Sequence, residues 1–317
     1  MKIFQFYKKY QKYFSFIFFF ICFSIISLEI YNNINFITSL IVTNFHYVYL
    51  ILLLQFLFYF IYNCRTYFSY KFFLKKNIEF RNWTYFFFKS LIYNNLLNFI
   101  GTIYRAILLK KNGISYIRST GILYLLYFSH LFVNFFLIVL GIFFFTDLII
   151  KEKVFFLLFL ITLSFFIYFF YDVIVFLCNK KLSKISAPFI KELFFLKKYF
   201  KKNLSNNFFL FNLFGNAIIL FLIELFIFYF AFSIFFVNYS YSNIFLLFVI
   251  AFILDKIPFI NNIIGLNEIL YGLIFTNVGL DFYQGVVIKF ICRITGIVTL
   301  ITYYLYILIF IRGNKLA

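Results

Sequence analysis

The chain has 317 residues, of which 65% are hydrophobic and only 12% are charged. A soluble core cannot bury that much apolar surface, so the composition excludes a soluble globular protein and indicates an integral membrane protein. The net charge of +19 is dispersed beside apolar runs, which argues against a nucleic acid as a partner.

Six apolar runs are long enough to cross a bilayer. They lie, in chain order, at residues 14–30, 45–62, 121–146, 154–178, 208–237 and 283–311. The first run is not followed by a small-residue cleavage site, so we expect it to be retained as a span. The sequence therefore predicts an all-α integral membrane fold with about six full transmembrane helices.

The basic residues indicate the orientation of these spans. Most of the 29 lysines and arginines lie at the two ends of the chain and in three segments, 63–82, 105–118 and 179–203. In contrast, 31–44 and 238–243 carry none. Because cytoplasmic loops are enriched in basic residues, we expect both termini in the cytoplasm and a location in the cell inner membrane.

Two further hydrophobic segments, 84–104 and 244–280, are interrupted by polar or flexible residues. The first is flanked by basic segments on both sides, so it is expected to enter from the cytoplasm and return. The second begins and ends near the uncharged side. Two oppositely inserted re-entrant hairpins are typical of an inverted repeat. We therefore predict one polytopic domain over 1–317, with halves of about 1–150 and 151–317 and the basic linker 179–203 in the second.

Helix-breaking residues mark the expected tip of each hairpin. Pro258, Asn262 and Gly265 interrupt the second, and Gly101 interrupts the first. Polar backbone at membrane depth is tolerated only against protein or a wet cavity, so these residues predict the breaks.

Four charged residues are candidates for a substrate route. Glu268 follows the second break, and an acid within a membrane commonly marks a pathway. It could bind a cationic head group, exchange a proton, or form a structural pair with Arg293 or Lys289. Arg293 could hold a phosphate, whereas Lys289 is expected to reach the outer head groups. Glu224 is expected to face the helix bundle, and Arg105 to catch a lipid phosphate or anchor the cytoplasmic edge of the first hairpin.

The sequence contains no phosphate-binding loop, nucleophile elbow or cysteine–histidine cluster. ATP-driven transport by this chain alone is excluded. We expect no enzyme activity, no cofactor and no metal site.

At its interruptions the chain resembles the transmembrane, flippase-like region of lysylphosphatidylglycerol synthases. The matching second-half positions are Pro258, Gly265, Glu268, Gly279-Leu280 and Arg293. The matching first-half positions are Gly101, Arg105, Leu108-Leu109-Lys110-Lys111 and Gly113-Ile114-Ser115. The chain departs from the pattern at Thr102, which stands where the family has a glutamate, and it lacks the first-half proline.

This resemblance implies the membrane part alone, in a stand-alone member without a synthase domain. It implies translocation of a phospholipid or lipid-linked precursor between leaflets, with lipids of anionic head group as partners. The alternative is a non-catalytic scaffold subunit for lipid- or glycan-synthesis enzymes. A membrane transferase with Glu268 as base, or an organelle-encoded subunit suggested by composition alone, are further alternatives.

Overall fold

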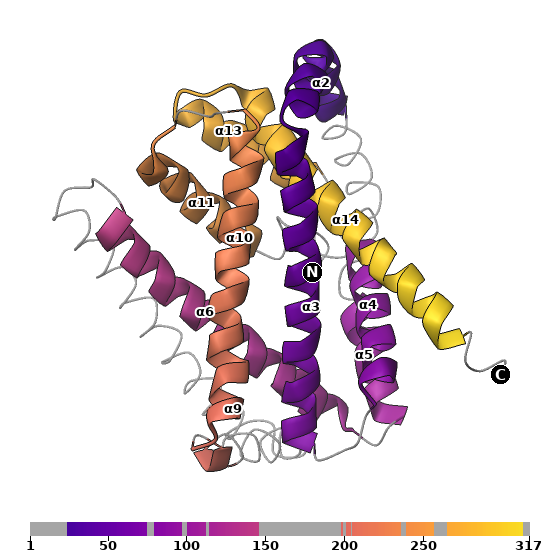
Figure 1. The fold of residues 1–317 in the computed structure, drawn as a ribbon. Coiled ribbons are helices and arrows are strands. Elements are labelled where there is room, and N and C mark those ends of the chain that lie inside the picture. Colours follow the sequence, from indigo (N-terminus) through magenta and orange to yellow (C-terminus); the bar gives the residue numbers. More distant parts are fainter. Residues whose placement is uncertain are drawn as a thin grey trace, which may run out of the picture. The chain divides into compact units, whose positions relative to one another are not determined.

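The computed structural model describes residues 24–74, 79–96, 100–111, 114–145, 198, 201–203, 205–235, 239–256 and 265–312 (Figure 1). Within these ranges the chain is helical and contains no strand, which confirms the predicted all-α class for the described part. The predicted span 154–178 and most of the basic linker 179–203 lie outside the described residues.

The helices follow one another along the chain with short connections. They are α2 (Ile34–Thr43), α3 (Phe45–Leu74), α4 (Phe80–Leu96), α5 (Ile100–Lys111), α6 (Tyr116–Phe145), α9 (Asn207–Leu210), the π-helix η1 (Phe211–Gly215), α10 (Asn216–Ser233), α11 (Tyr241–Lys256), α13 (Leu266–Asn277) and α14 (Phe282–Arg312). α3–α4–α5–α6 and α10–α11–α13–α14 repeat one order, in which two shorter helices stand between two longer ones.

Four of the predicted spans are confirmed as helices long and apolar enough to cross a membrane. They are Phe45–Phe72, Gly121–Phe144, Asn207–Ser233 and Phe282–Ile309. A fifth is counted if helix Ser24–Asn32 and α2, which are bent by 72°, form one broken span. We expected 31–44 only to connect two spans, so α2 corrects that expectation.

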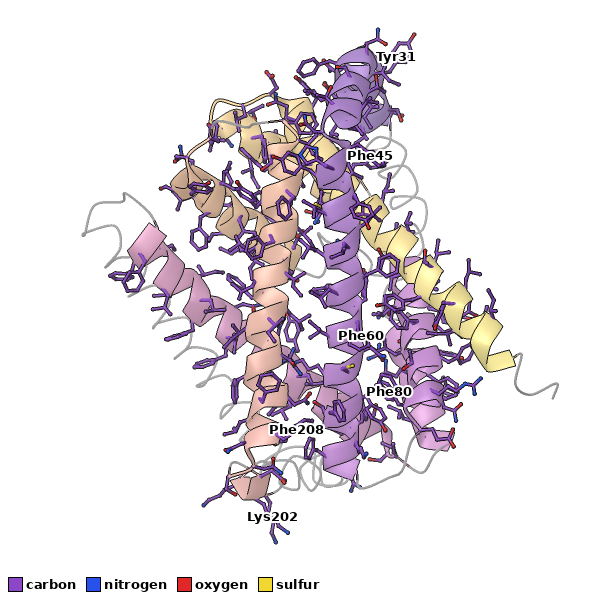
Figure 2. The ribbon with its side chains drawn as sticks, viewed as in Figure 1. Tyr31, Phe45, Phe60, Phe80, Lys202 and Phe208 are labelled. Atoms are coloured by element: carbon purple, nitrogen blue, oxygen red, sulfur yellow. The ribbon has the colours of Figure 1, made fainter. Side chains whose placement is uncertain are left out.

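Large apolar side chains cover the outer surfaces of these helices. Phe45, Phe60 and Phe208, labelled in Figure 2, are 62%, 49% and 50% exposed. Helices that are apolar on every side are typical of membrane spans, because the outward faces meet hydrocarbon rather than water. The exposed phenylalanines therefore fit a lipid-facing surface.

The chain forms two compact units. Unit 1 comprises residues 1–56 and 224–299, and unit 2 comprises 57–223 and 300–317. Each unit draws on both of the predicted sequence halves, and the predicted single domain with an inverted repeat stays a prediction.

Unit 2 has an aromatic core. Trp83 of α4 is 2% exposed and its ring centroid lies 4.8 Å from that of Tyr70. Phe88 stacks on Tyr303 of α14 with a centroid distance of 4.6 Å and an interplanar angle of 14°. Such ring pairs add to the burial energy, so these contacts stabilise α4 against α3 and the end of α14.

Helices α4 and α5 pack side by side as a hairpin in unit 2 (Figure 1). Their closest approach is at Gly101, where an added Cβ would lie 1.7 Å from the Ser90 carbonyl oxygen and 2.8 Å from the Asn94 side chain. A glycine is therefore required at this contact. The predicted hairpin 84–104 is confirmed as a helix pair, and its re-entrant insertion stays a prediction.

We expect Gly101→Ala to destabilise unit 2 by about 1–3 kcal/mol, because overpacking a close contact forces the backbones apart. Trp83, the single tryptophan of the chain, is buried in α4 and its emission reports the loss of this packing during thermal unfolding in detergent. Ile103→Ala is the matched control, because Ile103 is 56% exposed on the same helix. Equal midpoints for Gly101→Ala and wild type would contradict the close approach.

In unit 1, α13 and α14 approach closely at a second glycine. A Cβ at Gly285 would lie 2.5 Å from the Tyr271 carbonyl oxygen. This contact brings the first turns of α14 against α13 and so aligns the charged residues of the two helices.

Candidate functional site: a charged cluster in unit 1

The start of α13 fixes the position of Glu268. Gly265 has a φ of 96°, a left-handed conformation that glycine adopts without strain, and it is the N-cap of the helix. The Gly265 backbone N–H donates to Glu268 Oε2 at 2.8 Å. A carboxylate in the first turn also interacts favourably with the helix dipole. Gly265 thus has the predicted role of a break, and it orients the acid that follows it.

Glu268 forms an ion pair with Arg293 of α14. Arg293 Nη1 lies 2.7 Å from Glu268 Oε1, and the two side chains are 16% and 1% exposed. Of the partners left open by the sequence, the structure selects Arg293. A buried acid at this depth requires such a partner, because removing an unpaired charge from water is costly.

A second ion pair lies beside the first. Lys289 Nζ donates to Asp255 Oδ1 of α11 at 2.6 Å. The Asn267 amide donates to the same oxygen at 2.8 Å, and the Tyr271 hydroxyl donates to Asp255 Oδ2 at 2.9 Å. Asp255 therefore ties α11 to α13 and α14. The expectation that Lys289 reaches outer head groups is wrong for this conformation, since its ammonium group binds Asp255 and lies 4.8 Å from the Tyr271 ring centroid.

The two ion pairs share one face of α14, because Lys289 and Arg293 are four residues apart. They are also joined on α13, where Asn267 binds Asp255 and the next residue, Glu268, binds Arg293. We call Asp255, Asn267, Glu268, Tyr271, Lys289 and Arg293 the unit 1 cluster. Glu224, half-buried on α10, acts electrostatically on Tyr271 of this cluster.

The cluster becomes less exposed from one pair to the next. The Asp255 side chain is 26% exposed and Lys289 is 11% exposed, whereas Glu268 is 1% exposed. In this conformation the Glu268 carboxylate is closed off by Arg293. The geometry is that of the structural pair considered from the sequence, and a substrate reaches Glu268 only after the pair separates.

Arg105 belongs to unit 2 and has different surroundings. It is 4% exposed, its Nε and Nη2 donate to Ser90 Oγ at 3.1 and 2.6 Å, and its guanidinium lies 5.2 Å from the Phe87 ring centroid. The expectation of an exposed interfacial edge is thus wrong, because the α4–α5 contact buries the side chain.

The remaining predicted site residues differ in what can be said of them. Gly101 lies inside α5, where it permits the contact with α4. Pro258 and Asn262 lie outside the described residues. Among the described residues, no group of three or more His, Cys, Asp or Glu side chains could hold a metal ion.

The apolar helices with a charged cluster between them define a multi-pass, all-helical membrane protein. Residues 15–309 match the family model of the lysylphosphatidylglycerol synthase TM region, and the chain belongs to that family. Comparisons with curated proteins and with solved structures gave no match.

Proposed function

We propose that this protein translocates a phospholipid or lipid-linked precursor between the leaflets of the cell inner membrane, with both termini in the cytoplasm. The observation that carries the proposal is the buried Glu268–Arg293 pair beside a helix break, in a chain of this family. Ionisable residues within membranes are rare and commonly belong to substrate or ion pathways.

The pair gives the proposal a mechanism. A lipid phosphate offers oxygens that can replace the Glu268 carboxylate on Arg293, because guanidinium groups bind both anions in a forked geometry. The released carboxylate can then bind a cationic head group or take up a proton. The head group would move through polar surroundings while the acyl chains stay in the bilayer.

The Asp255–Lys289 pair supports an outer step on the same route. It is more exposed than the Glu268–Arg293 pair and lies on the same face of α14. A phosphate released by one cation can be received by the other, one helical turn away. Energy for directed movement would come from the lipid gradient, a coupled ion or a partner, and we propose that the chain catalyses no covalent reaction.

The proposal is tested by reconstituting the wild-type chain into vesicles that contain head-group-labelled lipids. A membrane-impermeant reductant bleaches only the outer leaflet, so loss of the inner-leaflet signal measures translocation. We expect faster loss than in protein-free vesicles for at least one anionic lipid. Rates equal to those of protein-free vesicles for phosphatidylglycerol, phosphatidylethanolamine and a polyprenyl phosphate would contradict the proposal and favour the scaffold alternative.

A further inference from the structure

A second buried cation, Arg65 of α3, lies in unit 2. Sequence patterning placed it in a cytoplasmic linker after a span ending at residue 62, but α3 continues to Leu74 and the candidate span to Phe72. Arg65 is 1% exposed. It is therefore an interior residue rather than part of a solvated loop.

The groups that hold Arg65 are all neutral. Its Nη2 donates to the Leu126 carbonyl oxygen at 3.2 Å, to Ser129 Oγ at 2.8 Å and to the Leu213 carbonyl oxygen at 2.9 Å. Its Nε is buried and finds no acceptor among the described residues. A guanidinium has five N–H donors and no acceptor, so part of its capacity for an anion is unused.

The described part of unit 2 offers Arg65 no counter-charge. Its single acid among the described residues is Glu79, which is exposed and accepts from Asn82 at 3.0 Å. Buried charges in proteins are normally paired, and arginine does not lose its proton to escape the cost. This contrasts with unit 1, where Lys289 and Arg293 each have a carboxylate.

The backbone around Arg65 is adapted to position it. Leu213 lies in the π-helix Phe211–Gly215, and such helical bulges are rare and frequent at functional sites. Asn212 of the same π-helix donates to the Arg65 carbonyl oxygen at 3.1 Å and to Ser69 Oγ at 2.8 Å. The guanidinium is thus held by α6 and by η1 at once, and its orientation is fixed.

We propose that Arg65 is the centre of an anion site that takes a phosphate group, carried by a lipid or free in solution. Phosphate oxygens supply the acceptors that Nε lacks and the negative charge that the surroundings lack. The site is separate from the unit 1 cluster and would bind phosphate even in a chain that moves no lipid.

The test measures binding by the full chain in a neutral detergent at fixed ionic strength, through the thermal midpoint followed by Trp83 emission. The probes are short-chain phosphatidylglycerol, the matching diacylglycerol, which lacks phosphate, and inorganic phosphate. We expect phosphatidylglycerol to raise the wild-type midpoint and diacylglycerol not to. A response to inorganic phosphate as well would show that the site accepts the free ion; a response to the lipid alone would assign it to a head group.

Arg65→Gln is expected to weaken this binding at least about tenfold, and Arg65→Lys severalfold, because lysine lacks the forked geometry. Lys71→Gln is the matched control: it removes one positive charge from an exposed position of the same helix and is expected to bind as wild type does. Should Arg65→Gln not fold, the comparison of Arg65→Lys with Lys71→Gln decides. Equal affinity of the Arg65 variants and wild type, or no wild-type response to any probe, would overturn the site.

Discussion

Arg293→Leu is expected to lower the free energy of unfolding by about 3–5 kcal/mol, because it leaves the carboxylate of Glu268 buried without its partner. Glu268 is 1% exposed, so water cannot replace the guanidinium. Chemical unfolding in detergent, followed by far-ultraviolet circular dichroism, measures this loss.

The double variant Arg293→Leu/Glu268→Gln separates a lost charge from a lost shape. With both charges removed, most of the stability should return, since replacing a whole buried pair is often close to neutral. Glutamine also keeps an oxygen that can accept from the Gly265 N–H. Ile294→Ala, at a neighbouring position that is 42% exposed, is the control. A double variant no more stable than Arg293→Leu would contradict the account of the pair.

Asp255→Ala is expected to have an effect of similar size, about 3–5 kcal/mol. Three donors, on Lys289, Asn267 and Tyr271, converge on this carboxylate, and Asn267 is fully buried. Each buried donor left without an acceptor costs about 1–3 kcal/mol.

Asp255→Asn keeps the shape and one acceptor oxygen, so its loss should be intermediate. Ile253→Ala, 49% exposed on the same helix, controls for the change in α11 itself. The same unfolding measurement applies. If Asp255→Ala were as stable as Ile253→Ala, Asp255 would not tie the three helices together.

Hydropathy predicted the spans well and their ends poorly. Runs such as 121–146 and 283–311 are so apolar that composition alone identifies them. The helix from Phe45 was predicted to end at residue 62, because Arg65 was taken as the cytoplasmic boundary. Carbonyl groups of α6 and η1 and the hydroxyl of Ser129 surround that arginine, so the charge enters the fold and α3 continues to Leu74. Which side chains surround a charge is a property of tertiary packing.

The site was predicted in part for the same reason. Glu268 and Arg293 stood out as charges in apolar sequence, and their pairing was one of the alternatives. Asp255 was missed because it precedes Lys256 near a proline break, where an acid is ordinary. Its partner Lys289 lies 34 residues away, and only the packing of α11 against α13 and α14 brings the two together. Its position shortly before Pro258, in a chain with 10 acids, is the signal that could have singled it out.

The most direct test of the central claim compares Glu268→Gln with Asp281→Asn in the vesicle translocation assay. Both changes replace an acid by its amide in unit 1, but Asp281 is exposed at the start of α14 whereas Glu268 is buried beside Arg293. With both variants folded by circular dichroism, we expect Glu268→Gln to slow translocation at least about tenfold, the effect of about 1.4 kcal/mol, and Asp281→Asn to match wild type. Equal rates for Glu268→Gln, Asp281→Asn and wild type would contradict a role for the ion pair in moving lipid.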